Sequence, residues 1–99
     1  MIRGTTPTLE FKLPFDVKLI EKASIALSQN RTVAIEKTLD DCTAEGQLLM
    51  IKLTQKETLK LRAGTKTEIQ VRVKTYDGDA LASNIIEVTT DRILREGEI

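Results

Sequence analysis

Two acidic loops contain the side chains best suited to acid–base or metal chemistry. Asp40, Asp41 and Glu45 lie in one polar connection, and Asp77 and Asp79 lie in another. Carboxylates on loops can supply some of the roughly six to eight oxygen ligands of calcium, or act as general acid and base when one pKa is shifted. Neither loop has the ligand series of an EF-hand, and aspartates are common in turns because they hydrogen-bond their own backbone. We therefore interpret both loops as turns and expect no metal site.

Other catalytic chemistry lacks its usual residues. The chain has 99 residues, no histidine and one cysteine, Cys42. A single cysteine forms neither an internal disulfide nor a four-ligand zinc site, and its thiolate would need activation by a lysine or a helix end. The sequence has no Gly-x-Ser-x-Gly elbow and no glycine-rich phosphate loop. We expect no enzyme activity and no cofactor.

Charge is balanced over the whole chain but unevenly distributed along it. The 15 basic and 15 acidic residues argue against a globally basic nucleic-acid binder. Residues 52–74 hold seven basic residues against two acids, a net charge of +5, and residues 75–99 hold two against six, a net charge of −4. No aromatic residue accompanies the basic ones for base stacking, so we expect no nucleic-acid partner. The two charged regions are either ordinary solvated surface or a means of steering head-to-tail contact between subunits.

Alternating apolar and polar residues predict β-strands over most of the chain. The runs are 8–13, 23–29, 32–38, 47–53, 65–75 and 80–90. Val33 and Ile35 are predicted to face inward, and residues 40–46 are interpreted as a polar connection. A capping-box pattern predicts one or two helical turns over Thr54–Lys60. In the last run the alternation changes phase, which predicts a β-bulge near Asn84.

The number and spacing of these runs predict the fold class. About six or seven short strands with regular turn signals favour an all-β fold, an antiparallel β-sandwich of immunoglobulin-like shape. A small β-barrel is the alternative. We expect a single domain over residues 1–99, with residues 1–7 and residues 91–99 (the tail) as extended arms. The start of the chain does not resemble a secretory signal, and no run approaches the roughly 20 apolar residues of a membrane span.

Two groups of apolar residues are left over once the core is assigned. The run 47–53 is apolar on both faces, since Leu48 and Met50 lie opposite the set that contains Leu49. Such a strand is either central in a two-layer stack or part of an interface. The tail contains Ile93 and Leu94, which are too few to fold alone. We interpret Leu48, Met50, Ile93 and Leu94 as interface candidates.

Several runs of sequence carry a resemblance to known proteins. The runs are Arg3–Asp16, Glu36–Cys42, Leu53–Gln55 and Gly78–Asn84. Through them nearly the whole chain resembles small uncharacterised prophage proteins of Gram-positive bacteria, a group that has no settled activity and therefore implies no site residues. The strand order, with the segment Lys22–Thr38, is also similar to the immunoglobulin-like N-terminal domain of phage baseplate upper proteins.

These observations lead to two hypotheses of function. The first is a non-catalytic structural or accessory protein of a phage or prophage, a tail- or baseplate-associated module that binds itself or other virion proteins as a homo-oligomer. It would be made in the host cytoplasm, and the virion is its second expected location. The alternative is a stand-alone β-sandwich module that binds carbohydrate or depends on calcium. The first hypothesis requires no cofactor, and neither hypothesis involves a membrane.

Overall fold

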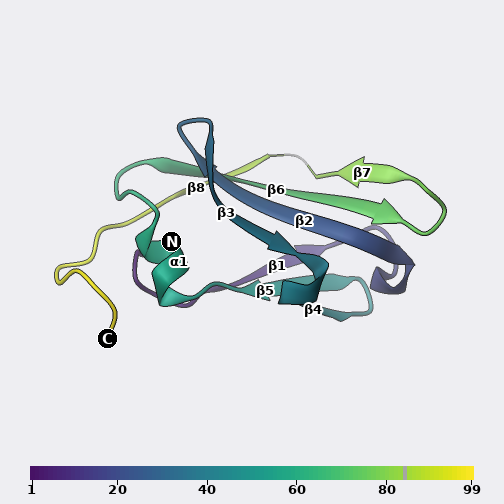
Figure 1. The fold of residues 1–99 in the computed structure, drawn as a ribbon, viewed down its shortest axis with the longest axis horizontal. Helices are drawn as coiled ribbons and strands as arrows, with labels where there is room; N and C mark the ends of the chain where they lie inside the picture. Colours follow the sequence, from purple (N-terminus) through teal and green to yellow (C-terminus); the bar gives the residue numbers. More distant parts are fainter. Residues whose placement is uncertain (84) are drawn as a thin grey trace.

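The strands of the computed structural model, which describes residues 1–83 and 85–99, form two antiparallel sheets packed face to face (Figure 1). The first sheet has the order β1-β5-β4 and comprises β1 (Thr8–Lys12), β4 (Cys42–Glu45) and β5 (Leu48–Lys52). The second has the order β3-β2-β6-β7, with β8 also paired to β6. It comprises β2 (Ile20–Gln29), β3 (Thr32–Thr38), β6 (Lys66–Thr75), β7 (Ala80–Ala82) and β8 (Ile86–Thr89).

The strand order matches that of immunoglobulin folds. The order β1-β5-β4 corresponds to strands B-E-D, and β3-β2-β6-β7 corresponds to C′-C-F-G. Because β7 pairs with residues 72–74 of β6 and β8 pairs with residues 66–69, these two short strands share one edge position. The predicted all-β sandwich is confirmed. The described strands number eight rather than six or seven because the predicted run 80–90 is divided and β4 was not expected.

Aliphatic side chains at every second position fill the space between the two sheets. The alternation along β2 buries Ile25 and Leu27 completely, and the alternation along β6 buries Val71 and Val73. Each fully buried side chain of this size contributes roughly 1.5–3 kcal/mol relative to an exposed one. The core comprises Ile20, Ala23, Ile25, Leu27, Ile35, Leu49, Leu53, Leu61, Ile69, Val71 and Val73.

In residues 1–83 and 85–99, helical structure is limited to short connections between strands. The 3₁₀ turns η1 (Val17–Leu19) and η2 (Leu39–Asp41) precede β2 and β4, and α1 (Gln55–Leu59) links the two sheets at one end of the sandwich (Figure 1). The capping box of α1 is confirmed, since the Glu57 N–H donates to Thr54 Oγ1 at 3.1 Å. Within residues 1–83 and 85–99, no helix has both the length and the apolar character needed to cross a membrane.

The tail runs beside the first residues of the chain. The Arg3 N–H donates to the Asp91 carbonyl at 3.1 Å, and the Asp91 N–H donates to the Met1 carbonyl at 2.6 Å. The Arg3 guanidinium also donates to the carbonyls of Leu59 and Leu61, at 2.9 Å and 2.6 Å. Both end segments are therefore attached to the α1 end of the sandwich.

Two local predictions are wrong. Residues 42–45 form strand β4 rather than part of a polar connection, because an edge strand with exposed side chains shows no hydrophobic alternation. Val33 is 55% exposed rather than inward, because the register shifts between Leu27 and Ser28 and leaves Ala34 without a direct partner. The predicted bulge at Asn84 lies outside the described residues.

Candidate interaction site

The outer face of the three-stranded sheet carries Leu48 and Met50. The alternation along β5 buries Leu49 fully and turns both of these side chains outward, leaving Leu48 37% exposed and Met50 half-buried. In the strand register Met50 lies between Glu10 of β1 and Thr43 of β4. This face therefore presents two apolar side chains among polar neighbours.

The tail holds the other two candidates and lies at the α1 end. Leu94 is 93% exposed, whereas Ile93 is half-buried. An ion pair between Arg3 and Glu96 attaches the tail to the N-terminal segment. The four sequence-predicted residues thus belong to two different surfaces of the fold.

An apolar groove of about 360 Å³ opens between the end of β1 and strand β7. Leu13 and Phe15 line it from the β1 side, and Val71 and Val73 of β6 reach it from the core. Leu81 pairs with Val73, faces the same side of the sheet and is 45% exposed. Because β7 has only three residues, it leaves part of the core edge uncovered. This groove has no signal in the sequence, because its walls come from three separate strands.

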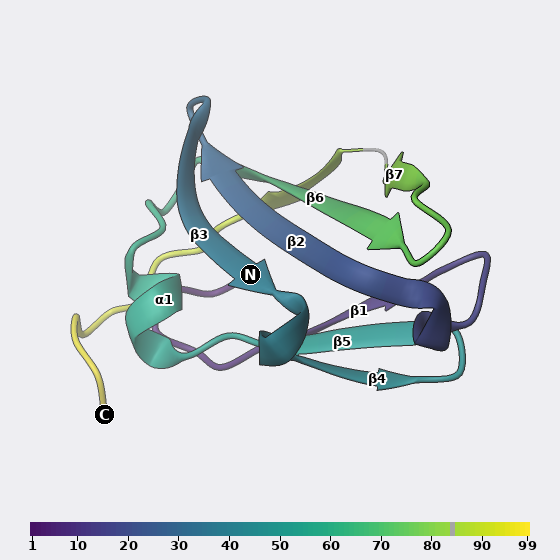
Figure 2. The ribbon, with the colours of Figure 1, turned by 45° about the vertical axis from the view of Figure 1, so that its right-hand side comes forward.

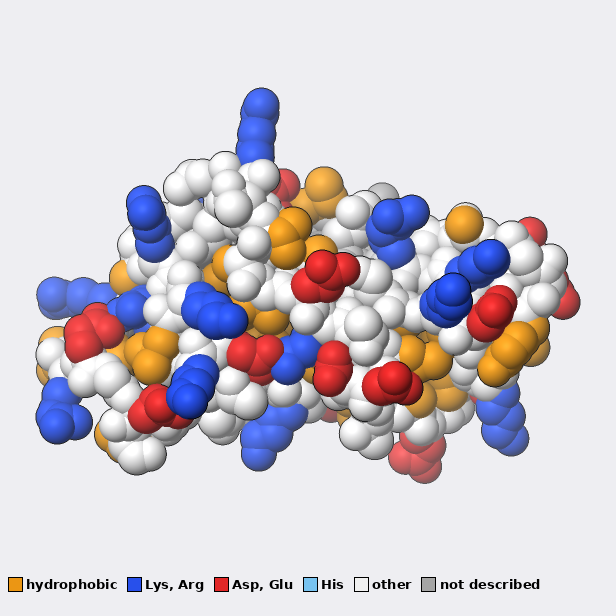
Figure 3. All heavy atoms as spheres, in the orientation of Figure 1, with side chains coloured by type: hydrophobic (Ala, Val, Ile, Leu, Met, Phe, Trp, Pro, Cys, Tyr) orange, Lys and Arg blue, Asp and Glu red, His pale blue; other side chains and the backbone are white. Residues whose placement is uncertain are grey.

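A second groove, of about 420 Å³, lies on the outer face of the same sheet edge. Its cations are Lys22, Arg72 and Lys74, and its small apolar lining includes Ala80 and Ala82. Lys22 and Lys74 are direct cross-strand partners, an arrangement of like charges that is destabilising. Among the ion pairs of residues 1–83 and 85–99, none involves these three cations. Figure 3 shows one face of the molecule, on which acidic and basic side chains are mixed over much of the surface.

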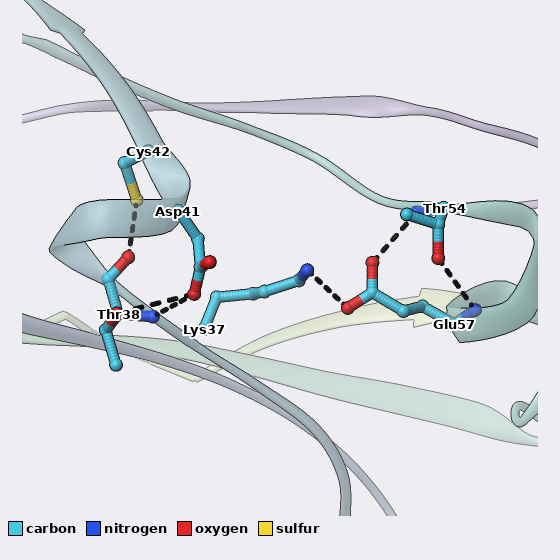
Figure 4. A network of polar contacts seen from close by, with 6 residues as sticks. All are labelled: Lys37, Thr38, Asp41, Cys42, Thr54 and Glu57. Carbon is cyan, nitrogen blue, oxygen red and sulfur yellow. Dashed lines mark hydrogen bonds and ion pairs between the residues drawn. The ribbon is translucent and has the colours of Figure 1, made fainter.

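A polar network connects β3 to α1 (Figure 4). The Lys37 ammonium forms an ion pair with Glu57 of α1, and the same carboxylate accepts the Thr54 N–H at 2.9 Å. On the other side of Lys37, the Asp41 carboxylate accepts the Thr38 N–H at 2.9 Å. Each carboxylate therefore accepts the backbone N–H of the residue that caps a short helical segment, Thr54 for α1 and Thr38 for η2. This role stabilises the structure.

The ionisation of this network follows from its contacts. Burial raises the pKa of Glu57, but the Lys37 ion pair and the Thr54 hydrogen bonds outweigh it and hold that pKa below its usual value. The hydrogen bond from the Thr38 N–H lowers the pKa of Asp41. Partial burial raises the pKa of the Cys42 thiol, and the neighbouring Asp41 charge raises it further by a smaller amount. Cys42 is therefore held as a thiol, which is a poor nucleophile.

The second acidic loop, which contains Asp77 and Asp79, is closed by a backbone hydrogen bond. In the second loop the Thr75 N–H donates to the Asp79 carbonyl at 2.9 Å, which closes the turn between β6 and β7. The interpretation of this loop as a turn is confirmed, since β6 and β7 pair antiparallel on either side of it. Among the residues that the structure describes, no three His, Cys, Asp or Glu side chains are grouped so that they could hold a metal ion.

The lowered carboxyl pKa values predict a loss of stability in acid. Because Glu57 and Asp41 bind protons less readily in the folded chain, their contribution to stability is complete above the unfolded pKa, about pH 4. It is lost as the pH falls through the lower folded pKa values. Lys37→Met should cost about 1 kcal/mol at pH 7 and reduce this acid dependence. Urea unfolding at several pH values measures both effects, and an unchanged acid slope in Lys37→Met would contradict the assignment.

Comparisons with protein-family models, with curated proteins and with solved structures each give no match. No relative therefore assigns a role to any residue of this site.

Proposed function

We propose that this chain is a non-catalytic interaction module of a phage or prophage particle, associated with its tail or baseplate. The observation that carries the proposal is an apolar side chain, Leu81, 45% exposed beside a groove at a sheet edge. Extended segments bind to such edges through main-chain hydrogen bonds, while pockets select their side chains. Leu48 is exposed and Met50 is half-buried beside the edge strand β4, and together they offer a second apolar contact. The phage assignment is supported by the resemblance of the sequence runs described above.

The proposed partners are other copies of the chain and neighbouring virion proteins. The protein is proposed to be made in the host cytoplasm and to act in the virion. Ile93 and Leu94 offer a separate apolar contact in the tail, at the α1 end of the sandwich, where Leu94 is almost fully exposed.

Met50→Lys tests this proposal. The Met50 side chain faces away from the core, so the unfolding temperature of the variant should lie within a few degrees of that of the wild type. Its assembly should be lost or greatly weakened. Light scattering gives the solution mass, and thermal unfolding followed by circular dichroism gives the stability.

Thr43→Lys is the matched control, because Thr43 is the exposed register partner of Met50 on β4. It introduces the same charge on the same face without removing an apolar contact. If Met50→Lys unfolds at room temperature, Met50 belongs to the core. If the wild type is monomeric at all concentrations, the self-binding part of the proposal is wrong.

The alternative is a stand-alone module that binds carbohydrate or depends on calcium. Sugar-binding platforms present exposed aromatic rings, and Phe11 and Phe15 are half-buried in this fold. Tyr76, 71% exposed in the β6–β7 turn, is the remaining aromatic residue of the chain. One exposed ring favours the interaction module over the alternative.

A further inference from the structure

The edge of β7 separates two surfaces of opposite chemistry. Its outer side faces the cations Lys22, Arg72 and Lys74, and its inner side faces the apolar groove at Leu13 and Phe15. Within residues 1–83 and 85–99, β6 is the one strand paired with β7, so its other edge is open to hydrogen bonding. A strand added there would place alternate side chains on the basic side and on the apolar side.

The tail has the complementary alternation. In an extended chain, Glu96 and Glu98 point to one side and Gly97 and Ile99 to the other. Ile99 is 100% exposed, and no ion pair of the described residues involves Glu98. The segment thus offers two carboxylates for the cations and one apolar side chain for the groove.

The tail and β7 of one molecule lie at opposite ends of the sandwich (Figures 1 and 2). The molecule is 47 Å long, and the backbone hydrogen bonds of Asp91 with Met1 and Arg3 hold the start of the tail at the α1 end. A contact between the tail and β7 therefore joins two copies. Since the two surfaces are different, this contact is head-to-tail and produces a ring or a filament.

We propose that the segment Glu96–Ile99 of one copy adds as a strand to the open edge of β7 in the next copy. Glu98 binds the cations Arg72 and Lys74, and Ile99 enters the groove beside Leu81. Glu96 exchanges Arg3 of its own chain for the same cations. This contact relieves the like-charge pairing of Lys22 with Lys74 and covers the exposed apolar groove. The inference rests on the proposed function and names its self-association contact.

A charge exchange tests the contact. Lys74→Glu and Glu98→Lys should each weaken self-association about tenfold or more, and the doubly substituted chain should recover most of the wild-type affinity. Sedimentation velocity over a wide range of concentration measures the affinity, and the wild-type affinity should fall as salt is added. Both positions are exposed, so the variants should retain the wild-type unfolding temperature.

Arg31→Glu is the control, because Arg31 is an exposed cation at the β2–β3 turn and does not line either groove. Its self-association should equal that of the wild type. A doubly substituted chain that associates no better than the single variants overturns this contact. If the wild type associates and Met50→Lys abolishes association while Glu98→Lys does not, the proposed function stands and this contact is wrong. A wild type that is monomeric throughout overturns this contact and the self-binding part of the proposed function.

Discussion

Replacement of Leu49 by alanine is expected to lower the free energy of unfolding by about 3 kcal/mol. Leu49 is fully buried on the inner face of β5 and belongs to the core between the two sheets. Its truncation removes apolar contacts and leaves a cavity that packed sheets fill only in part. Chemical denaturation followed by circular dichroism measures the loss, and the dependence on denaturant should remain unchanged.

Leu48→Ala is the matched control, since it removes the same atoms one residue earlier in the same strand. Leu48 is 37% exposed on the outer face, so the change should cost less than about 1 kcal/mol. Under the proposed function, this variant should instead weaken assembly. Equal losses of stability at the two positions would mean that β5 is buried on both faces and that its outer face is not a free contact surface.

The sandwich could be predicted from the sequence because its central strands have strict alternation. In β6, residues Ile69, Val71 and Val73 alternate with polar residues, and the structure buries all three. The capping-box pattern at Thr54 and the turn at Asp77 also fix local geometry over four residues, so their signals are complete in short segments.

The edges of the sheets were predicted less well, for a physical reason. In β4 three of the four side chains are exposed and Cys42 is half-buried, so Cys42–Glu45 shows no period of two in hydrophobicity. At Val33 the register shift depends on pairing with β2, and pairing is not encoded in the residues of one strand. Edge strands and bulges are decided by neighbours that are distant in sequence.

The candidate surfaces also differ in how well the sequence predicts them, according to whether their residues are neighbours in the sequence or only in the fold. Leu48 and Met50 were found because one strand carries apolar residues on both faces, which is a local signal. The basic groove was only partly anticipated, since Arg72 and Lys74 lie in the segment of net positive charge but Lys22 joins them through the pairing of β2 with β6. The apolar groove needs the end of β1 beside β7, a juxtaposition that the strand order creates.

Gln29→Leu is expected to lower the free energy of unfolding by about 2–3 kcal/mol. Gln29 is 7% exposed, and its amide oxygen accepts the Arg62 N–H at 2.7 Å. Its amide nitrogen donates to the Arg62 carbonyl at 3.0 Å and to Thr67 Oγ1 at 3.1 Å. Leucine has a similar size but no polar atoms, so the variant leaves these partners without their hydrogen bonds in a partly buried region. Gln47→Leu, at an exposed position in the β4–β5 turn, is the control and should change stability by less than about 0.5 kcal/mol.

The same substitution should loosen the tail, because the network continues toward it. Thr67 Oγ1 lies 2.8 Å from Thr90 Oγ1, and both threonines are fully buried. Thr90 is the last residue before the tail, so loss of the Gln29 contacts weakens the point from which the tail extends. The amides of Thr90 and Asp91 donate to the carbonyls of Thr65 and Met1. In the variant, the rate of hydrogen exchange should therefore increase more at these two amides than at the amides of β5. Uniformly faster exchange across both sheets would mean that Gln29 stabilises the whole fold and has no particular role in holding the tail.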